Sequence, residues 1–318
     1  MTDILTSYGH GIHAVDADYY APTIAAVHLI EDEGRVALVD TAHNDAVPRT
    51  LAQMEKLGLR PENVDYVILT HVHLDHAGAA GAFMQRFPNA TLVVHPRGAR
   101  HMIDPSKLEA AVHEVYGKEE ATRVYGTLVP TPAHRVQEAN HGLKLTLGKR
   151  ELTFYDTPGH AKHHVAIHDS KTGHVFTGDT FGISYRHLDR DGKQFIFPTT
   201  SPSQFDAQAL HETVDLIAAL KPEALYLTHY AQVTDVPRLT ADMHRLIDAY
   251  TAIALRERNA GHTGEARHTR IKQGLAELYQ QEAQAAGWAL QGDALLAFLE
   301  LDAELNAQGL GLWVDTQP

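Results

Sequence analysis

Apolar residues recur along the first part of the chain with two different spacings. Two apolar runs flank a polar turn at residues 31–34, which predicts a β-hairpin within residues 23–40. Residues 46–57 place apolar side chains at helical intervals, so a helix is expected there. The short β-branched run over residues 64–70 predicts a buried strand, and a helix over 77–87 and a strand over 90–96 continue the alternation.

The pattern changes twice further along the chain. From residue 97 to about residue 139 it becomes helical and loop-like and is interrupted by prolines, which predicts a helical insertion. Strand patterns resume in LKLTLG, ELTFYDT, HHVAIHD and GHVFTGD, and ALYLTHY follows a predicted helix over residues 203–220. Beyond residue 236 the pattern is almost purely helical. We therefore predict an α/β domain over residues 1–235, with two sheets covered by helices, and a helical C-terminal extension over residues 236–318.

Composition narrows the chemistry that this fold can support. The 318 residues include 27 Lys and Arg against 40 Asp and Glu, a net charge of −13, and no cluster of cations stands out. A nucleic-acid partner is therefore not expected, because binding to a phosphate backbone relies on clustered cations. The chain has no cysteine, which excludes disulfides, thiolate metal ligands and a cysteine nucleophile. Any bound metal must use the carboxylates and the 23 histidines.

The sequence shows neither a targeting signal nor a membrane-spanning pattern. The N-terminal residues lack both a basic start and an apolar run, so no secretory signal is expected. The chain contains no run of about 18 apolar residues, so no membrane span is expected. These observations predict a cytoplasmic protein that acts on a small-molecule substrate, without a membrane or nucleic-acid partner.

The segment THVHLDHAG at residues 70–78 concentrates metal-ligating side chains at a change of structure. Its candidate ligands are His71, His73, Asp75 and His76. The segment follows a predicted strand and leads into a predicted helix, and such a turn lets neighbouring side chains converge on one point. Imidazole and carboxylate suit zinc, iron and manganese. A solvated turn rich in histidine is the alternative, but the added Asp-His pair and the flanking elements favour a metal site.

The pattern HxHxDH after an apolar strand resembles the signature of the metallo-β-lactamase superfamily. This resemblance implies three further ligands in a fixed order, and each is present. DTPGH at residues 156–160 resembles the TPGH segment of the family and implies His160 as a ligand. FTGDT at residues 176–180 implies Asp179 as a carboxylate that bridges two ions, and YLTHY at residues 226–230 implies His229. The resemblance covers residues from about 20 to 232.

The family resemblance also implies a fold and a complete set of metal ligands. The implied fold is an αββα sandwich of two mixed β-sheets flanked by helices, here with a C-terminal helical extension. The first implied metal site consists of His71, His73 and His160, and the second of Asp75, His76 and His229, with Asp179 shared by both. Two divalent ions are therefore implied, with zinc as the default and iron or manganese as alternatives.

The identities of two implied ligands point to one part of the family. True β-lactamases of the family lack an aspartate at the Asp179 position, and flavodiiron relatives carry glutamate where this chain has His73. The motifs are most similar to the glyoxalase II, lactonase and quinolone-signal-response thioesterase branches. The resemblance therefore implies a dinuclear hydrolase in which a metal-bridging hydroxide attacks an ester, thioester or lactone. Asp75 is the expected catalytic residue, which orients the hydroxide and moves its proton to the leaving group.

Further residues are assigned from their positions next to these motifs. Asp40, in ALVDT, resembles an aspartate that supports the metal ligands in the family, and His164 follows TPGH closely. Both are expected to lie behind the ligands, with an ordinary polar strand end as the alternative for Asp40. Phe181, Tyr185 and His187 follow the bridging aspartate and are expected to contact the substrate, with ordinary core and loop packing as the alternative.

The same residues are compatible with three other functions. The same metal pair can activate water against phosphorus, which would give a phosphodiester or phosphotriester hydrolase. A persulfide dioxygenase with a single iron is the second alternative. The third is a regulatory module that retains its metals and acts through the helical tail. That tail is also consistent with a homodimer, or equally with a cover for the core.

Overall fold

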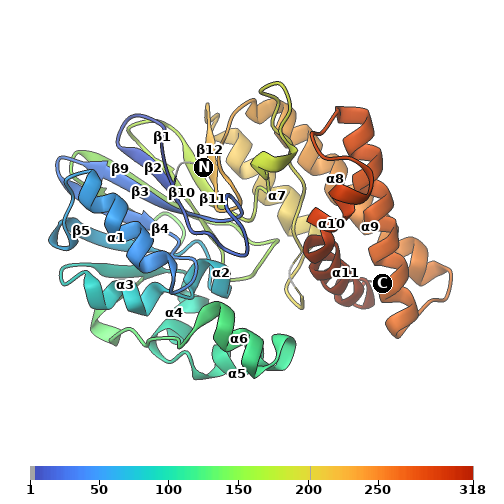
Figure 1. Cartoon of the computed structure of the whole chain (residues 1–318), viewed down its shortest axis with the longest axis horizontal. Coiled ribbons are helices and arrows are strands. Elements are labelled where there is room, and N and C mark those ends of the chain that lie inside the picture. Colours follow the sequence, from blue (N-terminus) through green and yellow to red (C-terminus); the bar gives the residue numbers. More distant parts are fainter. Residues whose placement is uncertain (1–3, 201, 318) are drawn as a thin grey trace. The chain divides into compact units, whose positions relative to one another are not determined.

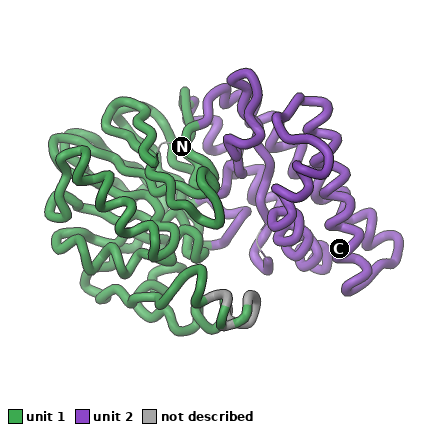
Figure 2. The backbone as a smooth tube through the Cα atoms, in the orientation of Figure 1, with its two compact units in different colours: residues 1–156, 163–178, 222–232 green, residues 157–162, 179–221, 233–318 purple. Residues whose placement is uncertain are grey.

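The computed structural model describes residues 4–200 and 202–317, with the backbone alone at residues 111, 113–116, 118, 120 and 121. The chain divides into two compact units (Figure 2). Unit 1 comprises residues 1–156, 163–178 and 222–232, and unit 2 comprises residues 157–162, 179–221 and 233–318. The division between residues 235 and 236 expected from the sequence stays a prediction.

The elements are given below in chain order, and Figure 1 labels most of them. The strands are β1 (Leu5–Ser7), β2 (Ile12–Asp16), β3 (Ala26–Asp32), β4 (Arg35–Val39), β5 (Val64–Ile68), β6 (Thr91–Val94), β7 (Val136–Glu138), β8 (Lys144–Leu147), β9 (Arg150–Asp156), β10 (Val165–Asp169), β11 (Val175–Gly178), β12 (Leu225–Leu227) and β13 (Ala231–Val233). The helices are α1 (Ala46–Lys56), α2 (Leu74–Ala77), α3 (Ala80–Arg86), α4 (Pro96–Ile103), α5 (Ser106–Tyr116), α6 (Lys118–Tyr125), α7 (Ala207–Ala219), α8 (Val236–Asn259), α9 (Gly264–Ala286), α10 (Gly292–Phe298) and α11 (Glu300–Asp315). Short 3-10 helices span Pro61–Asn63, Ala133–Arg135 and Arg186–Leu188.

The strands form two mixed sheets. The seven-stranded sheet has the order β1-β2-β3-β4-β5-β6-β7, antiparallel from β1 to β4 and parallel from β4 to β7. The six-stranded sheet has the order β13-β12-β11-β10-β9-β8, with β11 parallel to β12 and antiparallel pairs from β8 to β11. The predicted architecture of two mixed sheets flanked by helices, with further helices at the C-terminus, is confirmed.

The central strands bury apolar side chains on both of their faces. In β3, Leu29 packs in the cluster that contains residues of α1 and α3, whereas its neighbour Ile30 packs in the cluster shared with the other sheet. Phe154 and Phe176 contribute to this second cluster from the six-stranded sheet. The core between the sheets therefore holds the strand ends in fixed positions.

The hairpin of β3 and β4 forms as the sequence predicts. Leu29 pairs with Leu38, and Asp32 pairs with Arg35 across the turn. Glu33 and Gly34 both have positive φ angles, of 52° and 72°, which suits a two-residue connection between antiparallel strands.

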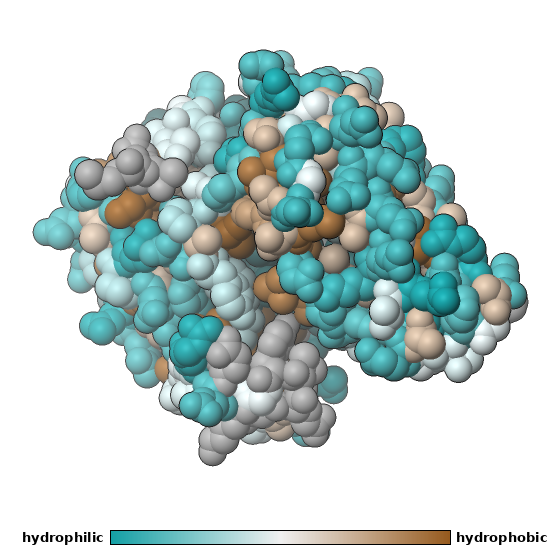
Figure 3. Space-filling view, turned by 45° about the vertical axis from the view of Figure 1, so that its right-hand side comes forward, coloured by the Kyte–Doolittle hydropathy of each residue, from teal (hydrophilic) through white to brown (hydrophobic). Residues whose placement is uncertain are grey.

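Unit 2 contains α7 and the four C-terminal helices α8 to α11. Its interior includes the hydroxyl pair Tyr250–Tyr279 at 2.8 Å, and Asn306 Nδ2 donates to Tyr279 Oη at 3.2 Å. Hydrophilic residues make up most of the face seen in Figure 3. Within residues 4–200 and 202–317, no helix is long and apolar enough to cross a membrane.

Several elements differ from those expected. Strands β1 and β2 were not predicted, and β7 lies inside the expected helical insertion, where it extends the parallel part of the sheet next to β6. Three-residue strands such as β1 and β7 are too short to show an alternating pattern. The end of the helical C-terminal region consists of two helices, α10 and α11, which meet at Leu299.

Candidate metal centre

The segment at residues 70–78 leaves β5 and turns into the short helix α2. His73 is the last residue before α2 and has extended backbone angles. Because the segment is irregular as far as His73, the two imidazoles point at one another, and His71 Nε2 lies 2.8 Å from His73 Nδ1. The ring of His76, one turn into the helix, lies 4.0 Å from the ring of His71. The three imidazoles of this segment therefore lie close together.

Asp40 connects the ends of three strands beneath these histidines. It follows β4, is completely buried and has a φ of 58°. Its carboxylate accepts hydrogen bonds from the Thr70 amide at 2.8 Å, from the Thr70 hydroxyl, and from Thr228 Oγ1 at 2.6 Å. It also contacts His76 Nδ1 at 2.7 Å. Since a carboxylate accepts hydrogen bonds, His76 carries its hydrogen on Nδ1 and presents Nε2 as an acceptor.

His229 is oriented in the same way from the end of β12. Its Nδ1 lies 2.8 Å from the carbonyl oxygen of Ile24, which can only accept, so Nδ1 donates and Nε2 is the acceptor. His229 Nε2 lies 3.2 Å from Asp75 Oδ2, and His76 Nε2 lies 3.6 Å from the same oxygen. Three acceptors therefore face one another in a small volume, an arrangement that a bound cation stabilises.

Within unit 2, His160 and Asp179 form the corresponding pair. His160 Nδ1 lies 3.1 Å from the carbonyl oxygen of Thr199, so its Nε2 is again the acceptor, and Nε2 lies 3.5 Å from Asp179 Oδ2. The loop that carries His160 packs tightly on α7. A Cβ added at Gly159, whose φ is +129°, would lie 2.4 Å from the Leu210 Cα, so the loop requires glycine there.

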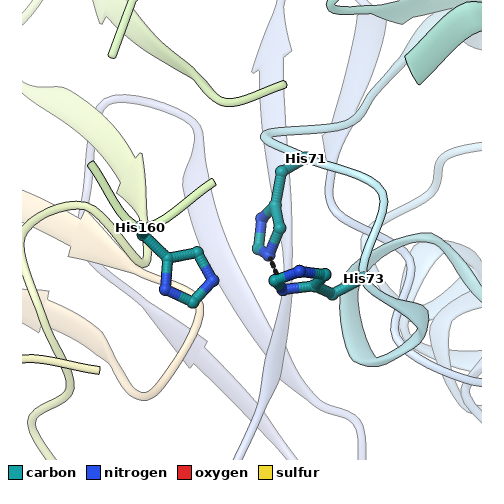
Figure 4. Close-up of side chains that lie close together, drawn as sticks. All are labelled: His71, His73 and His160. Carbon is teal, nitrogen blue, oxygen red and sulfur yellow. Dashed lines mark hydrogen bonds between the residues drawn. The ribbon is translucent and has the colours of Figure 1, made fainter. Parts of the chain in front are cut away.

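Three groups of side chains could each hold a metal ion. In each group the ligand atoms all lie within 4.8 Å of one another. The groups are His71, His73 and His160, then His71, His76 and Asp179, and then Asp75, His76 and His229. Figure 4 shows the first group, whose imidazoles point toward one another. All seven ligands expected from the sequence belong to these groups, and their nitrogen and oxygen donors fit zinc, iron or manganese.

Burial and charge distinguish the ligands. His71 and His76 are fully buried, whereas a quarter of the Asp75 side chain is exposed. Asp75 and the partly buried His73 are therefore the ligands that solvent can reach. The six-residue segment from His71 to His76 thus combines buried ligands with one accessible carboxylate.

Two tyrosines near Asp75 were not expected from the sequence. The hydroxyls of Tyr19 and Tyr125 lie 2.7 Å apart, and both residues are buried. Burial raises the pKa of Tyr19 well above its ordinary value, and the negative charge of Asp75 raises it further. Tyr19 follows β2 and Tyr125 ends α6, so their contact joins residues far apart in the chain. No local pattern in the sequence marks such a pair.

A buried histidine also lies close to the centre. His28, on β3, contacts Phe176 and Tyr226 edge to face and is 1% exposed. Burial lowers its pKa to about 4, although the Asp40 charge acts in the opposite direction. His28 is therefore neutral at pH 7.

The remaining residues expected near the metals have different surroundings. His164 is buried, and its ring stacks on that of His71 with the two ring centroids 4.9 Å apart. Phe181 is fully buried, and the rings of Tyr185 and His187 both contact Phe298 of α10. The Tyr185 hydroxyl donates to Asp302 at 3.2 Å. The substrate-contacting role of these three residues stays a prediction.

Comparison with known proteins agrees with this arrangement. The family model of the metallo-beta-lactamase superfamily matches residues 20–229. The chain therefore belongs to the metallo-beta-lactamase superfamily. The αββα fold implied by the motifs is confirmed by this match and by solved structures. The His and Asp clusters are the divalent-metal sites expected of a member of this superfamily.

Several individual relatives are similar over part or most of the chain. A metallo-beta-lactamase fold-containing protein of Sulfurisphaera tokodaii is 26% identical over 224 residues, which are 69% of this chain and 78% of that protein. A hydroxyacylglutathione hydrolase of Xanthomonas euvesicatoria is 28% identical over 56% of this chain and 52% of its own length. An N-acyl homoserine lactonase of Azorhizobium caulinodans is 46% identical over 55 residues, 17% of this chain and 19% of its own.

Solved structures show the same fold. A metallo-beta-lactamase family protein of Thermus thermophilus superposes with a TM-score of 0.66 at 19% identity and covers 97% of this chain and 93% of its own. The archaeal superfamily protein of Sulfolobus tokodaii superposes with a TM-score of 0.59 at 24% identity, over 74% of this chain and 86% of its own. The similarity to the Thermus structure extends to the C-terminal part of the chain.

Proposed function

We propose that the chain is a hydrolase that uses two divalent ions to cleave an ester, thioester or lactone in a small molecule. The observation that carries this proposal is the orientation of three histidines. In His76, His160 and His229, one ring nitrogen is taken by a carboxylate or carbonyl oxygen, so the other faces Asp75 or Asp179 as an acceptor. Ligands held in this way are prepared for metal ions.

Each residue has a separate task in the proposed reaction. Bound divalent ions supply a water of lowered pKa and polarise the oxygen of the scissile group. The three imidazoles of the first group would hold one ion, and Asp75, His76 and His229 would hold the other. Asp75 orients the attacking water and carries its proton to the leaving group, because it is both a ligand and accessible to solvent. Asp40 keeps His76 in the tautomer that binds metal.

The relatives favour carbonyl substrates. They include a hydroxyacylglutathione hydrolase and an N-acyl homoserine lactonase, whose names describe a thioester and a lactone. A putative diflavin flavoprotein of Nostoc is also similar, at 30% identity over 159 residues, 49% of this chain and 23% of its own. His73 stands where the family resemblance gives flavodiiron proteins a glutamate, which favours hydrolysis over redox chemistry.

A substrate panel tests the proposal. The chelated protein is reloaded with zinc, manganese or ferrous iron and assayed on chromogenic esters, thioesters, lactones, phosphodiesters and phosphotriesters, with oxygen uptake recorded on a persulfide. We expect metal-dependent cleavage of an acyl compound, reduced about 100- to 10,000-fold in Asp75→Asn. The control Asp191→Asn changes an aspartate whose side chain is 93% exposed and should leave the rate unchanged. Activity on phosphoryl compounds alone, or oxygen uptake alone, would overturn the proposal.

A further inference from the structure

Two helices of unit 2 carry the same pair of side chains at the same spacing. His211 and Asp215 lie four residues apart on α7, and His244 and Asp248 lie four residues apart on α8. Residues at this spacing share one face of a helix. The two helices therefore each present an imidazole and a carboxylate along one line. None of these residues belongs to the metal centre described above.

The four side chains pair across the two helices. His211 Nε2 lies 3.2 Å from Asp248 Oδ1, and His244 Nε2 lies 3.0 Å from Asp215 Oδ1. The two imidazole rings are nearly parallel, at 5°, and His211 Nδ1 lies 2.6 Å from His244 Nδ1. The crossed pairing shows that α7 and α8 run antiparallel here, and it makes the cluster nearly symmetric.

The two carboxylates fix the hydrogens of both imidazoles. An ionised carboxylate only accepts hydrogen bonds, so each histidine carries a hydrogen on Nε2. A neutral imidazole then has its lone pair on Nδ1, and the two Nδ1 lone pairs would face each other at 2.6 Å. Two facing lone pairs repel, and a cation between them removes the repulsion. The cation is either a proton that makes one ring an imidazolium or a metal ion.

We propose that the Nδ1 atoms of His211 and His244 bind a divalent transition-metal ion such as zinc, nickel, cobalt or copper. Imidazole nitrogen suits these ions, and a carboxylate on the other ring nitrogen is the usual support of a metal-binding histidine. A tetrahedral zinc ion with bonds of about 2.0–2.1 Å needs its two nitrogens roughly 3.3 Å apart, so the rings must open slightly. Two of the three histidines of the first metal group, His71 and His73, also have ring nitrogens closer than that, at 2.8 Å.

The two histidines are accessible to solvent, and an ion between them would link two helices of unit 2. The side chains of His211 and His244 are 23% and 29% exposed, so water can complete the coordination. The ion would join α7 to α8. On α7, Thr213 also donates to the carbonyl oxygen of Pro158, at 2.6 Å, in the loop that carries His160. The ion therefore stabilises the helix on which that loop packs.

The experiment counts zinc ions bound to the full chain by equilibrium dialysis and elemental analysis, and locates them by anomalous scattering from soaked crystals. His244→Gln should bind one ion fewer than the unmodified chain, whatever number the main centre holds. Asp248→Asn should keep the ion with about 10- to 100-fold weaker affinity, because the support of His211 is lost. In the unmodified chain, zinc should raise the unfolding midpoint more than it does in His244→Gln.

A matched histidine serves as the control. His268 on α9 is 24% exposed and contacts Glu304 at 3.1 Å, but has no second imidazole in contact among the residues described. His268→Gln should bind as many ions as the unmodified chain. Equal zinc counts in the unmodified chain and His244→Gln, with no anomalous peak between the two Nδ1 atoms, would show that a proton alone holds the pair and would overturn the proposal.

Discussion

Replacing Asp40 by asparagine perturbs the metal centre without changing any ligand. In the present structure, the oxygen Oδ2 contacts His76 Nδ1 at 2.7 Å and also accepts from the hydroxyls of Thr70 and Thr228, while Oδ1 accepts from the Thr70 amide. If the new amide group keeps its oxygen toward the Thr70 amide, its NH₂ group faces His76 Nδ1. The hydroxyls can rotate to accept, but His76 Nδ1 also carries a hydrogen.

His76 must then move or change its tautomer. A hydrogen transferred to Nε2 occupies the position that would bind the metal. Loss of the support behind a metal-binding histidine typically weakens metal affinity about 10- to 100-fold. This is equivalent to about 1.4–2.7 kcal/mol, at about 1.4 kcal/mol for each factor of ten. The Asp40→Asn chain should therefore lose the ion held by Asp75, His76 and His229 first.

Equilibrium dialysis against buffered zinc measures the effect, with metal content determined by elemental analysis. The control is Asp65→Asn on β5, which removes a carboxylate that pairs with Arg35 at the surface and has no contact with the metal ligands. The control should bind zinc as the unmodified chain does. If Asp40→Asn binds both ions with unchanged affinity, Asp40 does not set the tautomer of His76, and the role proposed for Asp40 is wrong.

Three further predictions concern stability. Gly159→Ala should lower the unfolding midpoint measured by calorimetry, because its Cβ would lie 2.4 Å from the Leu210 Cα; an unchanged midpoint would contradict this packing. Arg150→Met should lower the free energy of unfolding in urea by about 3–5 kcal/mol, because Asp169 loses a fully buried ion pair at 2.9 Å; a loss near zero would refute this. Burial lowers the pKa of His28 from 6.5 to about 4. Between these two pH values, His28 is protonated in the unfolded chain but neutral in the folded chain. The free energy of unfolding should therefore fall by about 3 kcal/mol as the pH drops from 6.5 to about 4. His28→Gln should reduce that fall, and an identical pH dependence would exclude His28 as its source.

The candidate ligands could be predicted from the sequence because their segments follow predicted strands. His71 comes shortly after β5, Asp179 comes directly after β11, and His229 comes shortly after β12. Strand ends place such side chains at one edge of the sheets, so their order along the chain predicts their convergence. The turn between β3 and β4 was predictable for a similar local reason, since Gly34 has the positive φ that the connection needs.

Contacts between distant parts of the chain were not predictable in this way. The Tyr19–Tyr125 hydroxyl pair and the hydrogen bond from Thr228 to Asp40 join residues that no local spacing connects. The short strand β7 was missed because three residues do not establish a period. Tyr185 was expected near the substrate from its place after the bridging aspartate, and its ring packs on Phe298 of a C-terminal helix, which the chain order does not reveal.

Anomalous scattering from crystals of the metal-loaded protein tests the two-ion centre most directly. We expect two peaks, one surrounded by His71, His73 and His160 and the other by Asp75, His76 and His229, both beside Asp179. Removal of the metals by a chelator should abolish both peaks and the hydrolytic activity together. A single peak, or two peaks that lie away from these ligands, would contradict the account.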